Sequence, residues 1–184
     1  MLTLLEPSGI DVVSLAEVKA HLRLDQPYED DYLQTLIQSA TEHVEQYLGR
    51  SLIAKTWHFV WKNNLSQEND LVSIPLPCPP LLEILSIEKV VRHNRKSPIK
   101  RYLLEYQGPQ PKITFGTCAE NIEITYKAGY GQYPKHVPSS IRQAILLKIA
   151  DFYENRVSTA LDSDEKSISL FKKILSPYRM MSLL

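Results

Sequence analysis

The segment ITYKAGYGQYP (residues 124–134) places two glycines and two tyrosines within five residues, directly after a strand-like run. A glycine-rich loop after a strand can cradle a phosphate when the amides of a following helix point at it. Here Val137 and Pro138 open the next helix in place of a lysine and a serine, and the proline removes one amide donor. Gly-Tyr-Gly also occurs in potassium filters, but no apolar run approaches the ~20 residues that a membrane span requires. We therefore predict a plain turn.

Residue types that serve catalysis or metal binding are present, but their spacing assembles no site. The sequence contains no HExxH and no GxSxG motif, and Cys78 lies among prolines without a nearby histidine. The acidic run 29–31 is explained by the positive end of a helix that starts there. We expect no enzyme activity, no cofactor and no metal site. The histidines are expected at the surface or half-buried: His21, His43, His58, His93 and His136.

A basic cluster occupies the segment RHNRKSPIKR (residues 92–101), which we predict to be a polar hairpin loop. A solvated loop is the favoured interpretation. The alternative is contact with the phosphate backbone of DNA, which would be independent of sequence and sensitive to salt. No aromatic residue interleaves with these charges, so stacking on single-stranded bases is not implied. The candidate DNA contacts are Arg92, Arg95, Lys96, Lys100 and Arg101.

Composition limits the class of protein. The chain has 184 residues, enough for one domain, and its 21 basic residues balance its 21 acidic ones. A net charge of zero provides no long-range attraction to nucleic acid or membrane and removes one defence against self-association. Two isolated cysteines favour a reducing compartment, and Glu6 and Pro7 interrupt the short apolar start, so we expect no signal peptide.

Two helices are predicted in the first part, residues 1–51. Ser14 and Glu17 have the spacing of a capping box, with Val13 and Val18 at the positions of a hydrophobic staple. A second helix is expected from residue 30 to residue 48, where apolar residues recur at helical spacing before a glycine that suits a C-cap.

The period changes to two in the second part, residues 52–131, which we predict to be a small antiparallel β-insert. The proline-rich segment 75–80 reads as a stiff connector between strands. Alternation and turn signals place six strands in this part: residues 56–61, 71–74, 84–91, 102–106, 112–115 and 121–127.

The third part, residues 132–184, returns to helical periodicity with a long helix that begins near Pro138. This helix is apolar on nearly all sides and therefore needs partners on more than one side. A mobile loop is expected at 158–167 and a short helix at 168–175. The predicted fold class is α+β in a single domain, with a mainly helical core (two N-terminal helices, a long helix and a short C-terminal helix) and an antiparallel β-insert.

Several stretches, taken in order, resemble one family. They are VSLAEVKAHLRLD, DDYLQTLIQSATEHVEQYLGRSL, IPLPCPPLLEILSI, ITYKAGYG, VPSSIRQAILLKIADFYENR and KILSPYR, which together span about residues 13–179. This set is similar to the head–tail connector proteins of phages and prophages, also called head-completion or adaptor proteins. The compact members are almost wholly helical, so the long β-insert is a departure from them.

The resemblance implies a structural protein of the virion neck that assembles in the cytoplasm of a bacterial host. Its copies would form a ring below the portal protein, extend the DNA channel and dock the tail or neck proteins. A ring needs two different faces on each subunit. The apolar surplus of the long helix and arginines suited to interfaces supply the candidates: Arg142, Ile145, Leu146, Ile149, Tyr153, Arg156, Tyr178 and Arg179. The alternatives are a DNA-packaging accessory protein and a protein adaptor that forms no ring.

Overall fold

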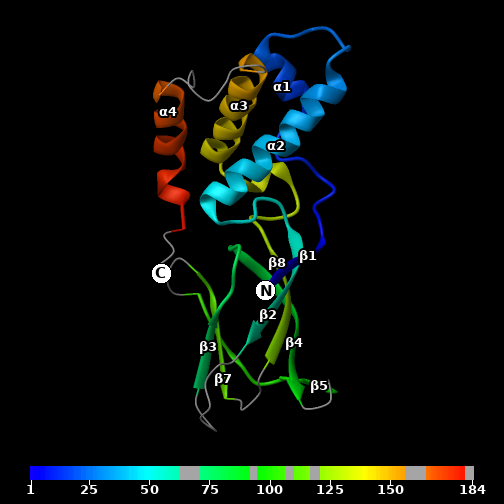
Figure 1. Ribbon diagram of the computed structural model, residues 1–184, viewed down its shortest axis with the longest axis vertical. Coiled ribbons are helices and arrows are strands. Elements are labelled where there is room, and N and C mark those ends of the chain that lie inside the picture. The colour runs from blue at the N-terminus through cyan, green and yellow to red at the C-terminus, as the bar shows by residue number, and fades with distance from the viewer. Residues whose placement is uncertain (63–70, 92–94, 107–109, 117–120, 156–164, 181–184) are drawn as a thin grey trace.

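The computed structural model describes residues 1–62, 71–91, 95–106, 110–116, 121–155 and 165–180 of the chain. The described elements form two bodies that are stacked end to end along the long axis of the molecule, with helices at one end and strands at the other (Figure 1). Each body has a hydrophobic cluster of its own.

The helical body contains four α-helices that enclose the first cluster. Its core includes Val13, Val18, Leu33, Ile37 and Leu48, all without accessible surface. Helix α3 packs against the other three, with α4 on one side of it and α2 on the other (Figure 1). The bounds are α1 Leu15–Leu22, α2 Asp30–Leu48, α3 Ser139–Glu154 and α4 Glu165–Leu175.

Local sequence chemistry explains where α1 and α2 begin and end. The Ser14 backbone N–H donates to the Glu17 carboxylate at 2.8 Å, and the Glu17 N–H donates to the Ser14 hydroxyl at 3.3 Å. This confirms the predicted capping box. Helix α2 ends at Gly49, whose φ of 65° is the left-handed conformation typical of a glycine C-cap, as predicted.

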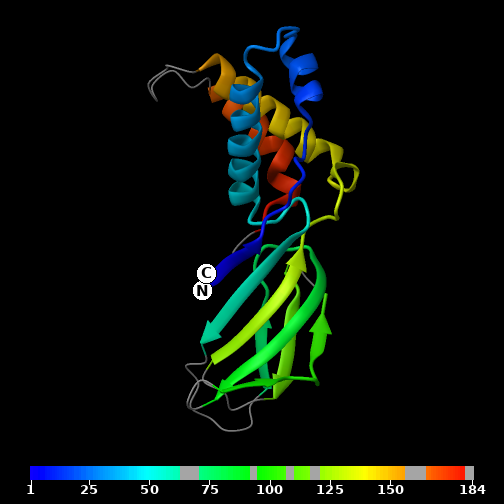
Figure 2. The same cartoon turned by 90° about the vertical axis from the view of Figure 1, so that its right-hand side faces the viewer.

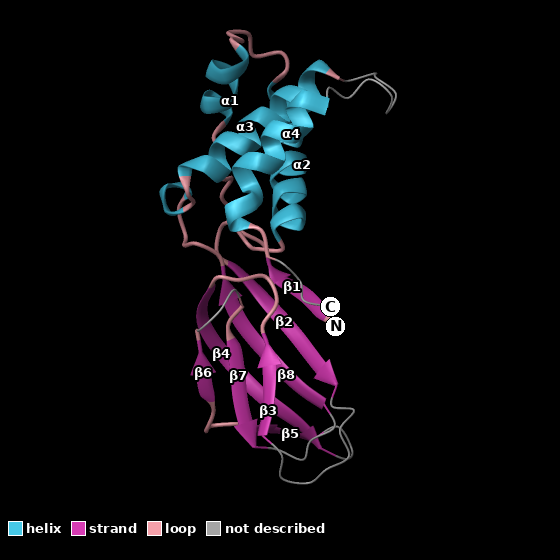
Figure 3. Cartoon of the chain, turned by 90° about the vertical axis from the view of Figure 1, so that its left-hand side faces the viewer, coloured by secondary structure: helices cyan, strands magenta, loops and turns pink. Residues whose placement is uncertain are grey.

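The other body is a sandwich of two antiparallel sheets (Figures 2 and 3). The five-stranded sheet has the order β1-β2-β8-β4-β5, and the three-stranded sheet has the order β3-β7-β6. The bounds are β1 Leu2–Glu6, β2 Lys55–Lys62, β3 Leu71–Pro75, β4 Leu81–Val91, β5 Arg95–Pro98, β6 Leu103–Glu105, β7 Lys112–Gly116 and β8 Asn121–Ala128.

The central strand β8 shows why this sequence forms a sheet. Its buried residues alternate strictly with half-buried ones, so one face of the strand turns to the second cluster. These buried residues are Ile122, Ile124, Tyr126 and Ala128. They meet Ile74 of β3 and Ile113 of β7 from the facing sheet in the same cluster.

The α+β class with an antiparallel β-unit is confirmed, whereas the expectation of a mainly helical core is wrong. The strands bury a core independent of the helices, because their alternating apolar residues face a second sheet and not the helical body. The assignment of the whole chain to one domain stays a prediction.

Three local differences concern segment boundaries. The predicted loop 92–101 contains strand β5, which pairs with the end of β4. Strand β1 joins the large sheet at the N-terminus, where we predicted no strand. The predicted mobile loop 158–167 overlaps α4 at residues 165–167, and its remainder lies outside the described residues. Within the described ranges, every helix is too short or too polar to cross a lipid bilayer.

Candidate assembly surfaces

The glycine turn at 129–131 joins the two bodies. The Gly129 N–H donates to the Pro80 carbonyl at 2.8 Å, and the Tyr130 N–H donates to the Leu52 carbonyl at 2.9 Å. The Gly131 carbonyl in turn accepts from the Ala54 N–H at 2.9 Å. A Cβ atom on Gly129 would lie 2.6 Å from the backbone of Ile53 and Ala54, and its φ is +144°. The turn therefore has the structural role that the sequence predicts, and glycine is required by close backbone approach.

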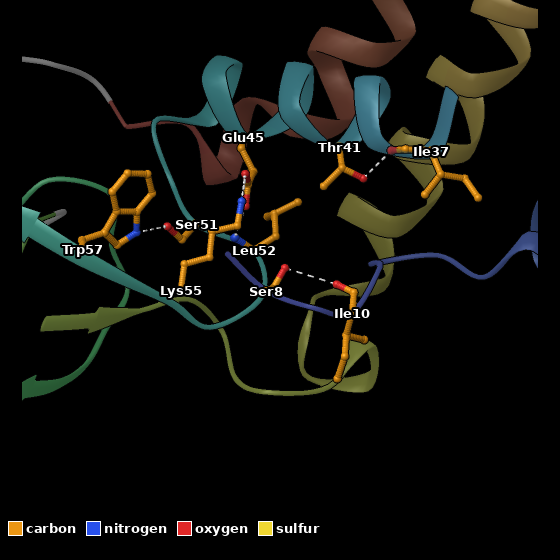
Figure 4. A network of polar contacts seen from close by, with 9 residues as sticks. All are labelled: Ser8, Ile10, Ile37, Thr41, Glu45, Ser51, Leu52, Lys55 and Trp57. Carbon is orange, nitrogen blue, oxygen red and sulfur yellow. Dashed lines mark hydrogen bonds and ion pairs between the residues drawn. The ribbon is translucent and has the colours of Figure 1, made fainter. Parts of the chain in front are cut away.

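A carboxylate at the end of α2 reinforces this joint (Figure 4). Glu45 accepts from the Leu52 N–H at 2.9 Å and from the Lys55 ammonium at 2.5 Å, and both charged side chains are largely buried. Nearby, the Trp57 indole donates to the Ser51 hydroxyl at 2.9 Å. Sequence reasoning missed this network. The only available signal was a glutamate on the last turn of a helix that leads directly into a strand.

Helix α3 is covered by other helices of its own chain. The apolar residues that we predicted to contact a second subunit therefore have partners within the chain. Ile145 and Ile149 have no accessible surface, and Leu146 is half-buried against the same cluster. Helices α1, α2 and α4 supply the partners that the nearly all-round apolar pattern demands. Ile145 and Ile149 are thus core residues of the subunit and present no surface to a second copy.

Two other interface candidates hold the helices together. Arg142 of α3 forms an ion pair with Glu17 of α1, which ties the capping box to the long helix. The Tyr153 hydroxyl donates to the carboxylate of Glu29, just before α2, at 2.5 Å. Both side chains are half-buried and bridge elements of one chain.

The C-terminal candidates also contact α2 and the segment after it. The Arg50 guanidinium donates to the Tyr178 carbonyl at 2.6 Å. The Arg179 guanidinium lies 5.0 Å from the centre of the Tyr47 ring, in cation–π geometry. Arg156, the remaining interface candidate, lies outside the described residues.

A groove of about 370 Å³ lies between α2, α3 and α4. Its lining includes Tyr47, Leu147, Leu170 and Phe171, so it is mostly apolar. Burial, followed by the charge of Lys148, lowers the pKa of the His43 imidazole at its rim, which favours the neutral form. Leu170 of α4, which is 49% exposed, contributes to this apolar surface.

The basic residues that we predicted to contact DNA differ in their surroundings. Lys96 of β5 donates to the Glu123 carboxylate of β8 at 2.7 Å, and Glu88 lies 4.0 Å from it. Three cations remain exposed beside it: Arg95, Lys100 and Arg101. Arg92 lies outside the described residues.

Comparison with known protein families shows to which family the chain belongs. The family model described as "Head completion protein" matches residues 11–181, which include the helical body and the described strands of the sandwich other than β1. The chain belongs to this family. The membership confirms the predicted relation to phage head–tail connector proteins.

Solved structures share the fold of this head completion protein over its whole length. A chain in the neck of an empty gene transfer agent (GTA) particle, computed with C6 symmetry, is 21% identical, with a TM-score of 0.79. A chain in the neck of the native GTA particle, computed with C12 symmetry, is 20% identical, with a TM-score of 0.75. Each match covers 100% of this chain and 97% of the other. No curated protein sequence matches the chain significantly.

Proposed function

We propose that this head completion protein is a structural subunit of a phage-type virion neck, without catalytic activity. Its copies form a closed ring below the portal protein, extend the channel for the DNA and present a docking surface to the next neck or tail component. The subunit would be made and assembled in the bacterial host cytoplasm.

The observation that carries the proposal is the family match over residues 11–181 together with the fold likeness over the entire chain. The β-insert, which separates this chain from compact helical connectors, is part of that likeness. The neck chains with the same fold come from particles computed with sixfold and twelvefold symmetry. Cyclic symmetry of order higher than two requires heterologous contacts, in which one face of a subunit meets a different face of its neighbour.

The hydrogen-bonded joint between the two bodies suits this role. A ring closes only when every subunit holds the same shape, because a small error in angle accumulates around the circle. The backbone bonds of Gly129 and Tyr130 and the Glu45 carboxylate fix the sandwich relative to the helices.

Electron microscopy of negatively stained protein tests the proposal, with the protein imaged alone and mixed with its own portal protein. We expect annular particles in at least one of the two samples, with a central opening. A protein that stays monomeric at high concentration and leaves the portal undecorated would contradict the ring and favour an adaptor that forms none.

Contact with duplex DNA is a second candidate function for the basic residues of β5 and the segment that follows it. Arg95, Lys100 and Arg101 are exposed on β5 and the segment that follows it. Charge reversal at Arg95 and Lys96 is expected to abolish salt-sensitive retention on duplex DNA. Reversal of Lys172 and Lys173 on α4 serves as the matched control. Equal retention of both double variants would reject β5 as the contact.

A further inference from the structure

The two edges of the large sheet expose apolar side chains that no part of the described chain covers. Strand β1 forms one edge, and Met1, Leu4 and Leu5 are 84%, 40% and 52% exposed. Near the opposite edge, Leu82 and Leu85 of β4 are 44% and 45% exposed. Because these patches lie at opposite edges of one sheet, they can contact each other only when they belong to different copies of the chain.

Both edges also leave main-chain groups without a strand partner. The Val60 N–H donates to the Met1 carbonyl at 2.8 Å, so the alternation of antiparallel pairing turns the polar groups of Leu2 and Leu4 away from β2. On the far side, the strand pairing of β5 with β4 runs from Glu88 to Val91, and just beyond it the Ile99 N–H donates to the Ile87 carbonyl at 2.8 Å. Within the described residues, no strand pairs on that side with residues 81–86 of β4, although Ile99 and Tyr102 line a groove beside Ile84 and Leu85. This open half forms a notch above β5.

The two edges lie at the same level of the sheet. Leu4 pairs with Trp57, Trp57 pairs with Tyr126, and Tyr126 pairs with Ile84. The adjacent row runs through Leu2, Phe59, Ile124 and Ile87. A rotation about an axis parallel to the strands therefore brings β1 of one copy to the height of the notch on the next.

The strand directions also agree. Each neighbouring pair from β1 through β2 and β8 to β4 is antiparallel, so β1 and β4 run in opposite directions. Strand β5 is antiparallel to β4 as well. Strand β1 of a neighbour placed in the notch would thus continue the line of β5 with the correct polarity for pairing.

Bulges in β4 decide what kind of contact the notch offers. The register with β8 shifts at Leu82 and again at Leu85, so each is an extra residue without a partner across the ladder. Bulges weaken continuous pairing at an edge. Beside them, a groove of about 240 Å³ is lined by Ile84, Leu85, Ile99 and Tyr102 among others. Apolar side chains that enter this groove would contribute more than a long ladder of hydrogen bonds.

Charge favours a second copy as the occupant. Near β1, Glu6 is exposed, and a groove between β1 and α2 is lined by Asp11 and Glu42. The buried charges of Lys55 and Glu45 in this groove cancel each other, and the Met1 ammonium lies at the other end of β1. On the notch side, the exposed Lys100 and Arg101 stand between two groove residues in the sequence, and Arg95 follows the same edge. The β4 carboxylates Glu83 and Glu88 lie within 4 Å of Lys127 and Lys96. One edge is therefore acidic and the other basic.

We propose that β1 of each subunit docks in the notch on β4 of the next, so that the large sheets join side by side around the ring. The contact is heterologous, since the β1 edge and the β4 edge are different surfaces, and such a contact closes into a ring when the rotation permits. This inference rests on the proposed function and adds to it the surfaces through which copies meet.

Two half-blocked variants test the contact. Leu4→Asp with Leu5→Asp removes the apolar β1 edge, and Leu82→Asp with Leu85→Asp removes the notch. The matched control is Leu103→Asp with Tyr106→Asp, which changes two comparably exposed residues on and beside β6 of the other sheet. Assembly is measured by sedimentation velocity in the condition in which wild type forms rings, alone or with its portal protein.

The expected pattern is specific to a head-to-tail contact. Each half-blocked variant stays monomeric alone, their equimolar mixture forms a dimer and nothing larger, and the control assembles as wild type does. Half-blocked variants that still form rings overturn this inference and leave the proposed ring intact. A wild type that forms no ring in either condition contradicts the proposed function itself.

A disulfide experiment covers the case in which an aspartate variant does not fold. Leu4→Cys and Leu85→Cys are placed in separate chains, both with Cys78→Ser and Cys118→Ser. Oxidation in the ring-forming condition is expected to give covalent dimers in the mixture and none in either chain alone. Dimers of one chain with itself, or no dimers in an assembled mixture, overturn the proposed contact.

Discussion

The helical body and the β-sandwich differ in where they leave large apolar residues exposed. The helical body encloses the aliphatic side chains of α3 between α1, α2 and α4, so that Ile145 and Ile149 have no accessible surface. The sandwich also encloses a core of buried apolar residues, but it leaves leucines and tyrosines exposed along its edges. A helix can bury its apolar stripe against the rest of the protein. An open sheet, by contrast, retains two edge strands that need a partner or protection.

This contrast separates what stabilises the subunit from what assembles it. Composition alone placed the assembly surface on the most apolar helix, but that helix is already satisfied within the chain. The surface left for neighbours lies where the sheet ends. The following changes test the contrast in order of expected effect.

The largest effect is expected from Ile145→Asp, which places a charge among buried aliphatic residues of the helical body. Burying an unpaired carboxylate costs several kcal/mol, so we expect a loss above about 4 kcal/mol and an unfolded or aggregated protein. Far-ultraviolet circular dichroism and thermal melting measure it, with Leu103→Asp on β6 as an exposed control. A folded Ile145→Asp variant that fails only in assembly would move the interface back to α3.

The joint is tested by Gly129→Ala, with Gly116→Ala as the matched control. A Cβ atom at Gly129 collides with the backbone of residues 53 and 54, whereas a Cβ atom at Gly116 meets nothing within 4 Å. We expect a loss of about 3 kcal/mol for the first variant and little change for the second, measured by urea unfolding. Equal stability of both variants would mean that the close packing at the joint is dispensable.

Glu45→Gln removes the charge that links α2 to β2. Glu45 accepts from the Leu52 N–H and the Lys55 ammonium, and hydrogen bonds to charged groups contribute about 1.5–3 kcal/mol. We expect a loss of about 2 kcal/mol in urea unfolding, whereas Glu154→Gln at the exposed end of α3 should change little. A loss no larger than that of the control would remove Glu45 from the joint.

The smallest effect is expected at the start of α1. Ser14→Ala should cost about 1 kcal/mol, as loss of an N-cap does elsewhere. The backbone hydrogen bond from Ser14 lowers the pKa of the Glu17 carboxyl more than burial raises it, with Arg142 a further lowering influence. A lowered carboxyl pKa stabilises the fold above the ordinary pKa of glutamate, and this contribution is lost as the pH falls through the lowered value.

The stability difference between wild type and Glu17→Gln should therefore be present at pH 7 and shrink as the pH falls below about 4. Urea unfolding across this pH range measures it. A difference that does not change with pH would mean that the Glu17 charge contributes nothing to the cap.

Local chemistry predicted much of the fold. The capping box at Ser14, the apolar stripe that ends at Gly49 and the alternation along residues 121–127 each depend on neighbouring residues in the chain. The family also followed from the sequence, through the order of several stretches and not from one motif.

The surfaces could not be predicted in the same way, because exposure is a property of the assembled chain. From the sequence alone, Ile145 belongs to a helix with more apolar residues than one packed face can bury, because the packing of α4 beside α3 is not yet known. Leu4 and Ile84 belong to distant segments, and only the strand order shows that they end the same row of one sheet, with the bulged Leu85 next to Ile84. Glu45 gains its role from Lys55, which lies beyond the six residues that connect α2 to β2, and no spacing rule encodes this contact.

An electron cryomicroscopy reconstruction of the ring, at a resolution that traces individual strands, would show directly whether β1 of one subunit contacts β4 of the next. We predict that β1 of each subunit runs antiparallel beside residues 81–86 of its neighbour, with α3 enclosed in its own chain. A ring whose subunits meet through α3 while β1 and the first half of β4 face solvent would contradict the account.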